Sequence, residues 1–537
     1  MAVTAMSNDR VRRSVLELDG ARLTIHDAID VSRRGRRVRL SERAAHAVRA
    51  SWALKHRLIE QEIPIYGVTT GFGDSAHRQI SSAKADKLQQ NILRFMGVGT
   101  GPLAPPEVVR VTMLLRANCL AKGNSGVRVE LVEHLLDLLN SDALPRIPER
   151  GSCGASGDLA PLSYVGRALA GDGLVDFAGA TRPAADVLAK LGLEPFVLEA
   201  KEGLALTNGT SFMSAFACLA AGAAHELADV ADLLTAMASE ALLGNRGHFN
   251  AFLFDDAKPH PGMVASAHNI RELLAESGLA LDSDERFSGG LDGAQFVELD
   301  RHVQDKYSIR CAPHVTGVLR DVLSWVEDWI AVEINSSDDN PLFNVGGGRV
   351  ESGGNFYGGH MGQAMDSLKV ALANLCDLLD RQLELLVDEK FNYGLTPNLI
   401  PRFAASDPEA GLHHGFKGMQ LCCSAMTAEA IKLCNPATVH SRSTEAHNQD
   451  KVSMGTIAAR DARSIVELAQ NIAAIHLIAC CQALELRGAD HASPRTQQAY
   501  HLLRDRVAFL DRDRYMDEDI ASAVSLIHSG ALSTLVG

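Results

Sequence analysis

Positive charge is scarce in this chain. The chain of 537 residues has 52 lysines and arginines but 66 aspartates and glutamates, so its formal net charge is −14. A surface of this sign repels polyanions and anionic lipid headgroups. The composition therefore disfavours nucleic acid and membranes as general partners. No uninterrupted apolar stretch is long enough to span a bilayer, which agrees with that expectation.

Paired cysteine motifs are also missing. The ten cysteines form no C-x-x-C pair, and most of them lie in apolar runs of helical character. We therefore expect reduced core thiols and a cytoplasmic protein rather than a disulfide framework. Arg10, Arg12 and Arg13 are not followed by an apolar segment, so the start of the chain does not have the pattern of a secretory signal peptide.

Metal and nucleotide motifs are absent as well. The sequence has no H-E-x-x-H, no Walker loop and no clustered Cys/His spacing. Gly97, Gly99 and Gly101 do not make the G-x-G-x-x-G pattern of dinucleotide sites. We expect no metal. A pyridoxal phosphate enzyme stays open, because its Schiff-base lysine has no universal local signature.

What the chain does have is helical periodicity. Apolar residues make up 46% of it and charged residues 22%, as in soluble globular proteins. Helical patterns cover 41–60, 83–121, 127–139, 315–334 and 457–486, and 175–197 reads as a small β-rich patch. The pattern over 83–121 is broken by the three glycines named above, Gly97, Gly99 and Gly101. Six apolar residues repeat at steps of three and four, as one buried helix face requires: Met361, Met365, Leu368, Leu372, Leu375 and Leu379. These patterns predict a mostly α fold with a core bundle of long antiparallel helices and a smaller, mixed, loop-rich N-terminal part.

One stretch of small residues stands out, Gly154-Ala155-Ser156-Gly157-Asp158. Small side chains allow unusual backbone geometry. Local evidence alone favours a tight turn before a helix, with Ser156 or Asp158 as N-cap and Pro161 in the first turn. A second glycine-rich stretch follows Tyr66 and indicates a loop that can move or approach a ligand closely.

The wider sequence changes the interpretation of that stretch. Further segments occur in order along the chain: Tyr66-Gly67-Val68-Thr69-Thr70-Gly71-Phe72-Gly73, Leu206-Thr207-Asn208-Gly209-Thr210, Tyr307-Ser308-Ile309-Arg310-Cys311, Asn335-Ser336-Ser337-Asp338-Asp339-Asn340-Pro341, His447-Asn448-Gln449-Asp450 and Ser453-Met454-Gly455. Together with Ala155-Ser156-Gly157 they resemble the aromatic amino acid ammonia-lyases and aminomutases, over residues 16–488. The resemblance implies a fumarase/aspartase-like helical architecture and a homotetramer whose sites are each shared by three subunits.

In that family an Ala-Ser-Gly tripeptide cyclises and loses water to give 4-methylideneimidazol-5-one (MIO). The resemblance implies that Ala155, Ser156 and Gly157 form this group. Little bulk is tolerated, because the glycine nitrogen must reach the alanine carbonyl, and the serine supplies the hydroxyl that is lost. We expect a tail over 1–15, an N-terminal domain over 16–210 with the tripeptide and the base loop, a helix bundle over 211–490 and a helical cap over 491–537.

The resemblance also assigns roles to other residues. Tyr66 would be the base, which requires a pKa brought well below the usual value of about 10. Arg310 would grip the substrate carboxylate, and Tyr307 would assist on the amine or ring side. Asn208 and Asn340 would add hydrogen bonds around the ring and the carboxylate, and Phe356 would lie beside the ring and exclude water.

Four positions suggest the substrate. Phe95-Met96 resembles the Phe-Leu of phenylalanine lyases rather than the Ser-His of histidine lyases or the His-Leu of many tyrosine lyases. Gln449 stands where histidine lyases carry glutamate, and Glu445 and Lys417 also match phenylalanine lyases. We therefore expect non-oxidative deamination of an aromatic L-amino acid, L-phenylalanine, to trans-cinnamate and ammonia. Met96 replaces the usual leucine and makes the pocket more adaptable.

Alternatives remain open at this point. A phenylalanine or tyrosine 2,3-aminomutase and a tyrosine ammonia-lyase share the residues above. An aspartase/fumarase-type lyase is disfavoured, because its G-S-S-x-M-P-x-K-x-N loop is missing. A non-catalytic helical scaffold predicts an unmodified tripeptide. One departure from the family pattern is Asn355-Phe356-Tyr357-Gly358-Gly359, where the family often has Asn-Phe-His-Gly-Gln.

Overall fold

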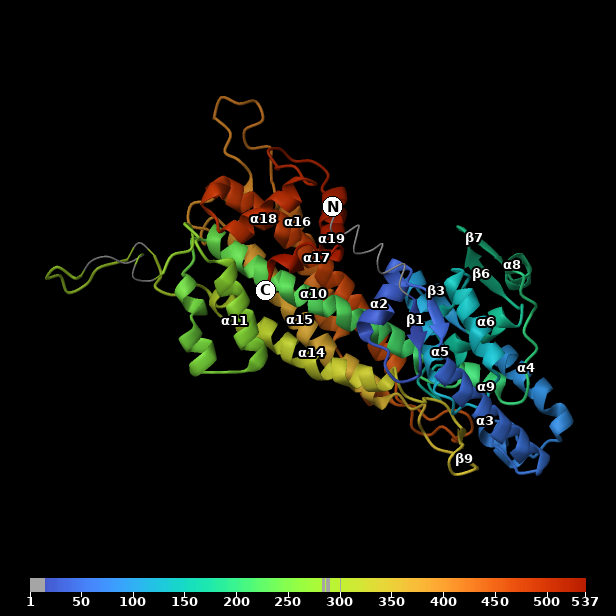
Figure 1. Cartoon of the computed structure of the whole chain (residues 1–537). Coiled ribbons are helices and arrows are strands. Elements are labelled where there is room, and N and C mark those ends of the chain that lie inside the picture. The colour runs from blue at the N-terminus through green and yellow to red at the C-terminus, as the bar shows by residue number, and fades with distance from the viewer. Residues whose placement is uncertain (1–14, 283–284, 286–289, 300) are drawn as a thin grey trace. The chain divides into compact units, whose positions relative to one another are not determined.

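The computed structural model describes residues 15–282, 285, 290–299 and 301–537 (Figure 1). The expected tail over 1–15 lies outside the described residues, except for Val15. The chain forms two compact units, each assembled from separated stretches. The first contains 1–222, 326–366 and 436–463, and the second contains 223–325, 367–435 and 464–537. The expected domains at 16–210, 211–490 and 491–537 are continuous stretches, whereas both units are discontinuous. That division stays a prediction.

The first unit combines helices with short strands. Its helices are α2 (Ile25–Arg34), α3 (Glu42–Glu60), α4 (Ala85–Met96), α5 (Pro106–Ala121), α6 (Val129–Asn140), α7 (Leu159–Leu169), α8 (Ala184–Leu191) and α9 (Glu202–Thr207). Its strands are β1 (Leu16–Leu18), β2 (Val38–Leu40), β3 (Thr100–Leu103), β4 (Leu144–Pro145), β5 (Pro148–Arg150), β6 (Leu174–Phe177), β7 (Ala180–Pro183), β8 (Leu342–Asn344) and β9 (Arg349–Glu351). Helix α5 is buried along nearly its whole length and contacts α2, α3 and α6, so it is the centre of this unit.

The strands form small sheets of two or three. β1 and β2 are parallel, whereas the pairs β3–β5 and β8–β9 and the sheet β4–β6–β7 are antiparallel. The expected β-rich patch over 175–197 is only partly correct. It holds the β6–β7 hairpin, but α8 follows at once and ends at Gly192, which has the left-handed conformation typical of a helix C-cap.

The helical pattern over 83–121 is two helices, with the break at the glycines where the sequence predicts it. Helix α4 ends at Gly97, and α5 begins at Pro106, where a proline can occupy the first helical turn. Between them β3 pairs with β5. The pattern over 41–60 agrees with α3, which Ser41 caps by accepting a hydrogen bond from the Ala44 backbone N–H.

The second unit is built mainly from helices. It includes α11 (Pro261–Leu273), α13 (Tyr307–Arg310), α16 (Lys417–Leu433), α18 (Pro494–Arg504) and α19 (Asp517–His528). Four long helices contribute residues to both units: α10 (Ser211–Ala241), α14 (Pro313–Glu333), α15 (Gly359–Val387) and α17 (Gly455–Arg487). The mostly α fold class is confirmed.

The long helices run alongside one another as a bundle (Figure 1). Polar contacts inside the second unit join α10 to α14 and α15. Gln382 Nε2 of α15 donates to Thr235 Oγ1 of α10 at 2.9 Å. Arg320 of α14 forms an ion pair with Asp232 of α10 at 2.7 Å. The six apolar residues of the 361–379 repeat all lie on α15 and are fully buried, as their spacing predicts.

Helix α17 bears on the expectation that no stretch of the sequence spans a membrane. A window within it has a mean hydropathy of 1.5, so length and composition alone would let it cross a membrane. However, 78% of that window is buried inside the protein, as in the core helix of a bundle. Polar residues interrupt the apolar run, which is why the sequence shows no uninterrupted stretch of this length: Glu467, Gln470, Asn471, His476 and Gln482.

Candidate active site

A pocket of about 300 Å³ lies within the first unit. Nine of the predicted site residues line it: Tyr66, Phe95, Met96, Ser156, Asn208, Asn340, Phe356, Glu445 and Gln449. The other lining residues are Gly71, Phe72, Gly73, Ser75, Leu88, Ile92, Leu159 and Leu204. Residues from five distant stretches of the chain therefore meet around Ser156.

The backbone at the small-residue stretch is unusual, as the sequence suggests. Gly154 and Gly157 have φ values of 78° and 70°, and Ser156 between them has a φ of 59°. A Cβ on Gly157 would collide with the carbonyl oxygen of Gly209, so only glycine fits there. Ala155 lines the adjoining cavity beside Ser156. The tripeptide is thus a tight, bulk-free loop whose serine faces the pocket.

Asp158 is not the helix cap that the local pattern suggests. It occupies the position before α7, but its side chain makes no capping hydrogen bond. Instead, its carboxylate is fully buried and accepts hydrogen bonds from Ser152 Oγ at 3.0 Å, from Met213 N at 2.8 Å and from Thr456 Oγ1. Burial raises the pKa of Asp158 to about 6. The carboxylate joins three segments directly beneath the tripeptide.

Tyr66 lies in the pocket with its hydroxyl accepting a hydrogen bond from the Gly73 backbone N–H at 2.9 Å. Burial raises the pKa of Tyr66, and the negative charge of Glu445 raises it further, while the Gly73 hydrogen bond opposes them. The expectation of a lowered pKa is therefore wrong for one chain by itself. A base at this position needs a cation that the lining residues do not include.

The amide of Asn208 has a defined orientation. Its Nδ2 donates to Asp339 Oδ1 at 3.0 Å and to the Asn340 carbonyl at 3.3 Å. Both partners are acceptors, so the nitrogen must face them, and only Oδ1 is left for another partner. Asn208 can therefore accept a hydrogen bond from a substrate but has no N–H left to donate.

The loop that carries Glu445 and Gln449 closes another side. Gln449 Nε2 donates to Ser156 Oγ at 3.2 Å, and the two carboxylate oxygens of Glu445 share the Asp74 backbone N–H at 2.9 and 3.1 Å. Glu445 and the two residues after it have left-handed φ values of 53°, 52° and 65°. Such a run is rare outside functional sites, because each residue carries strain.

Helix α4 supplies the apolar side of the pocket. Its four lining residues are Leu88, Ile92, Phe95 and Met96, and none offers a hydrogen-bonding group. The ring of Phe95 lies 6.2 Å from that of Phe72, a spacing typical of interacting aromatic pairs. The geometry therefore fits an apolar ring on the α4 side and polar groups on the side of Ser156.

Five predicted residues do not line this pocket. Two of them, Ala155 and Gly157, flank Ser156 in the chain. Tyr307, Arg310 and Lys417 belong to the second unit. The Tyr307 side chain is 72% exposed with the Arg310 guanidinium 4.5 Å from its ring centre, and Lys417 is exposed at the start of α16. Among the described residues that line the pocket there is no lysine, arginine or histidine. A carboxylate substrate thus meets no cation from this part of the chain.

A buried layer behind the pocket was not predicted as functional. Lys201 pairs with Asp339 at 2.6 Å, and Arg116 pairs with Asp338 at 2.7 Å, all within the first unit. The two aspartates lie in the quoted 335–341 segment, but no sequence signal links them to the two cations. Within the described part of the chain, no group of three His, Cys, Asp or Glu side chains could hold a metal ion.

With this geometry in place, comparisons identify the protein's relatives. The model of the family described as "Aromatic amino acid lyase" matches residues 23–505. The chain belongs to this family. The family is MIO-dependent, and its solved members share the fumarase-like helical fold that the sequence implies.

Curated relatives of different specificity match over nearly the full length. A histidine ammonia-lyase from Gloeobacter violaceus is 41% identical over 96% of each chain, and a tyrosine ammonia-lyase from Cupriavidus metallidurans is 39% identical over 97% of each. The crystal structure of tyrosine aminomutase from Streptomyces globisporus matches with a TM-score of 0.91 and 36% identity, covering 97% of this chain and 98% of that one. An aromatic amino acid substrate fits the family, whereas the particular amino acid differs among these relatives.

Proposed function

We propose that this protein is an ammonia-lyase that converts L-phenylalanine to trans-cinnamate and ammonia. The apolar face of α4 carries the proposal. A phenol hydroxyl or an imidazole N–H placed against Phe95 and Met96 would lose its hydrogen bond to water without a replacement. An unsubstituted phenyl ring has no polar group, so it loses no hydrogen bond to water there. The site therefore favours phenylalanine over tyrosine and histidine.

The residues at 155–157 fit the group that the family uses. Glycine is required at 154 and 157 by positive φ and by the close approach of Ser453 and Gly209, and the Ser156 hydroxyl faces the pocket. We propose that Ala155, Ser156 and Gly157 form MIO, an electrophile that takes up the substrate amine and makes it a better leaving group. Gln449 holds the Ser156 side chain by a hydrogen bond at 3.2 Å.

The remaining lining residues divide the work. Oδ1 of Asn208 accepts a hydrogen bond from an N–H of the substrate amine, because both N–H groups of its own amide are already used. Tyr66 removes the β-proton. Phe356 closes the pocket beside the tripeptide and excludes water.

We further propose a homotetramer in which neighbouring subunits complete each site. The lining residues of one chain lack a cation, while Arg310 and Lys417 are exposed or half-exposed in the second unit. A subunit that brings Arg310 into the pocket would supply the partner of the substrate carboxylate. Its positive charge would also lower the pKa of Tyr66, which burial alone raises. All ten cysteines are free thiols, which supports a cytoplasmic location.

A 2,3-aminomutase is the second candidate. The close structural match to tyrosine aminomutase favours it. In that reaction the released amine would return to the β-carbon. The named residues can serve both reactions, so the products must decide between them.

The deciding experiment incubates the purified protein separately with L-phenylalanine, L-tyrosine and L-histidine and resolves the products by chromatography. Cinnamate from phenylalanine, lost in Ser156→Ala, is the expected result, with an intact mass about two waters below that of the unmodified chain. β-Phenylalanine as the main product would identify an aminomutase. Turnover of tyrosine or histidine alone would overturn the substrate assignment. No turnover of any of the three amino acids, together with the mass of the unmodified chain, would overturn the assignment of the protein as an enzyme.

A further inference from the structure

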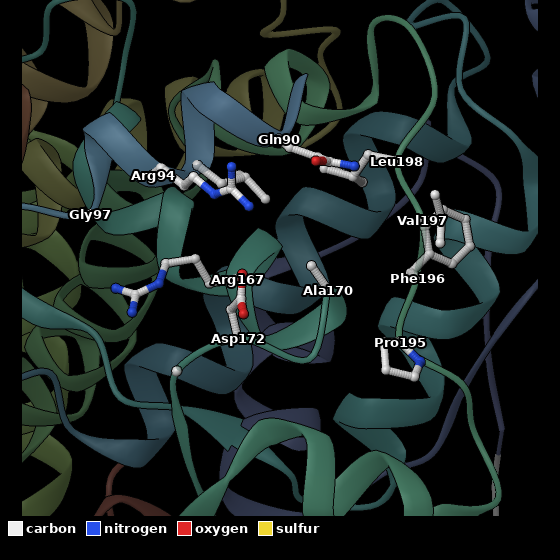
Figure 2. A pocket seen from close by; sticks show the side chains of 12 residues that line it. Gln90, Arg94, Gly97, Arg167, Ala170, Asp172, Pro195, Phe196, Val197 and Leu198 are labelled. Carbon is white, nitrogen blue, oxygen red and sulfur yellow. The ribbon is translucent and has the colours of Figure 1, made fainter. Parts of the chain in front are cut away.

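A second cavity of about 500 Å³ lies in the first unit, apart from the residues assigned above. Figure 2 shows Arg94 and Arg167 on one side of it and Pro195, Phe196, Val197 and Leu198 on the other. The cavity therefore has two arginine side chains on one side and an apolar wall on the other. No role in the proposed reaction accounts for either feature.

The two arginines have no acidic partner in the part of the chain that the structure describes. Neither forms an ion pair within the described residues, although Asp172 lines the same cavity. Arg94 makes a single long hydrogen bond to Asn91 Oδ1 at 3.4 Å, and the Arg167 guanidinium lies 5.1 Å from the ring centre of Tyr164. Most of their N–H donors are thus free for a ligand.

Two glycines leave room around Arg167. A Cβ on Gly97 would lie 3.1 Å from Arg167 Nη1, and a Cβ on Gly173 would lie 3.4 Å from Nη2. A side chain at either position would crowd the guanidinium. The planar donor group therefore stays open to a bidentate acceptor, which is the geometry of a carboxylate.

The opposite wall is apolar and open. Val197 is 72% exposed, and Phe196 beside it is held by the Arg128 guanidinium, which lies 4.5 Å from its ring centre. An exposed apolar wall that faces cations suits a ligand with an anionic end and an apolar body. Inorganic anions would leave this wall in water.

Helix α4 separates this cavity from the candidate active site. Leu88, Ile92 and Phe95 line the active-site pocket, whereas Leu93, Arg94 and the residue that ends the helix, Gly97, line the second cavity. At 100° per residue these two sets lie on opposite faces of the helix. A ligand that holds Arg94 therefore acts on the same helical turn as Phe95.

We propose that this cavity is a second binding site for organic carboxylates with an apolar body, and that its occupation changes substrate affinity through the last turn of α4. The binding itself is independent of the proposed function. The effect on turnover rests on it.

The test counts binding sites by equilibrium dialysis with 3-phenylpropanoate. The double variant R94Q/R167Q is expected to lose one binding equivalent per chain, with affinity at that site weakened by about ten-fold or more. Lys87→Gln, which removes a positive charge from α4 outside the cavity, is the matched control and should keep that equivalent. An equal number of sites in wild type and in R94Q/R167Q would overturn the proposal.

Two further experiments test the chemical class of the ligand and the effect of its binding on substrate affinity. The neutral 3-phenylpropanamide and inorganic phosphate should each fail to displace the probe from the site that R94Q/R167Q loses, and displacement by either would overturn the carboxylate assignment. In kinetic assays, 3-phenylpropanoate that competes with substrate at the catalytic pocket raises the KM of wild type and of R94Q/R167Q alike. An additional change of KM in wild type alone is the expected sign of coupling, and its absence would overturn it. If no amino acid is turned over, the dialysis still decides on binding.

Discussion

Lys201 Nζ lies 2.6 Å from Asp339 Oδ2, and both side chains are fully buried. The other oxygen of Asp339 accepts from Asn208 Nδ2 at 3.0 Å. The ion pair therefore fixes the amide of a residue that lines the active-site pocket. Lys201 holds a left-handed backbone conformation with a φ of 82°, as the residue before α9, so the helix and the pair are positioned together.

Lys201→Met should strongly destabilise the protein. It removes the cation and leaves the Asp339 carboxylate buried without its charge partner, which costs about 3–5 kcal/mol. Denaturant unfolding measures the loss. The control is Arg146→Met, which breaks a half-exposed pair with Asp176 and should cost about 1 kcal/mol or less. Equal losses in the two variants would contradict the role of the buried pair.

Glu445→Gln should move the rising limb of the pH–rate profile to lower pH. The carboxylate of Glu445 adds to burial in raising the pKa of Tyr66, since a nearby negative charge disfavours tyrosinate. Removing that charge lowers the pKa, so the base form is present at lower pH. The measurement is kcat/KM for phenylalanine against pH.

The control for this shift is Asp74→Asn. Asp74 is exposed next to Glu445, but its carboxylate is not among the charges that act on Tyr66. Its profile should keep the wild-type position. A limb that stays in place in Glu445→Gln would argue that Tyr66 is not the titrating base.

Phe95→His should raise activity toward tyrosine relative to phenylalanine. The imidazole offers a hydrogen-bond partner to the phenol hydroxyl on a face of α4 that otherwise has none. We expect the ratio of kcat/KM values to change by about ten-fold or more. Phe95→Leu is the control, because it also removes the ring but adds no polar group. The same change of ratio in both variants would show that pocket volume, rather than hydrogen bonding, decides.

The sequence predicts those residues of the site that lie within short characteristic segments. Ser156, Asn208 and Asn340 each stand inside such a segment, and the structure brings them to one pocket. The Lys201–Asp339 pair joins residues 138 positions apart, so no local pattern reveals it. The pKa of Tyr66 could not be predicted either, because it depends on burial and on Glu445, which is distant in sequence. Helix α8 was also not predicted, because its eight residues follow the β6–β7 hairpin at once and the whole of 175–197 reads as β-rich.

A mixture of two inactive variants should recover activity if neighbouring subunits share sites. Tyr66→Phe and Arg310→Met each remove one required group, and each should lose most of its kcat/KM, about a hundred-fold or more. In co-expressed hybrids with random assembly, about a quarter of the sites would receive an intact Tyr66 and an intact Arg310 from different chains. Activity well above that of either variant is expected. Recovery no greater than the sum of the separate variants would mean that both groups act from one chain.

His476 of α17 is a fully buried imidazole within the second unit. Its Nδ1 lies 2.9 Å from the Leu379 carbonyl, to which it donates as the neutral tautomer, and Nε2 has no hydrogen-bond partner among the described residues. Burial lowers the pKa of His476 from 6.5 to about 4. The unfolded chain therefore binds a proton more tightly than the folded one between these two values.

His476→Gln should flatten the acid limb of the stability profile. In wild type, the neutral histidine contributes fully above pH 6.5, and this contribution is lost as the pH falls toward 4, by about 3 kcal/mol in total. Glutamine can still donate to Leu379 but does not titrate. Denaturant unfolding at several pH values measures the difference between the two slopes. His501→Gln, at an exposed position of α18, should keep the wild-type slope. If His476→Gln also keeps it, the acid sensitivity comes from other groups, such as the carboxylates that become protonated in this range.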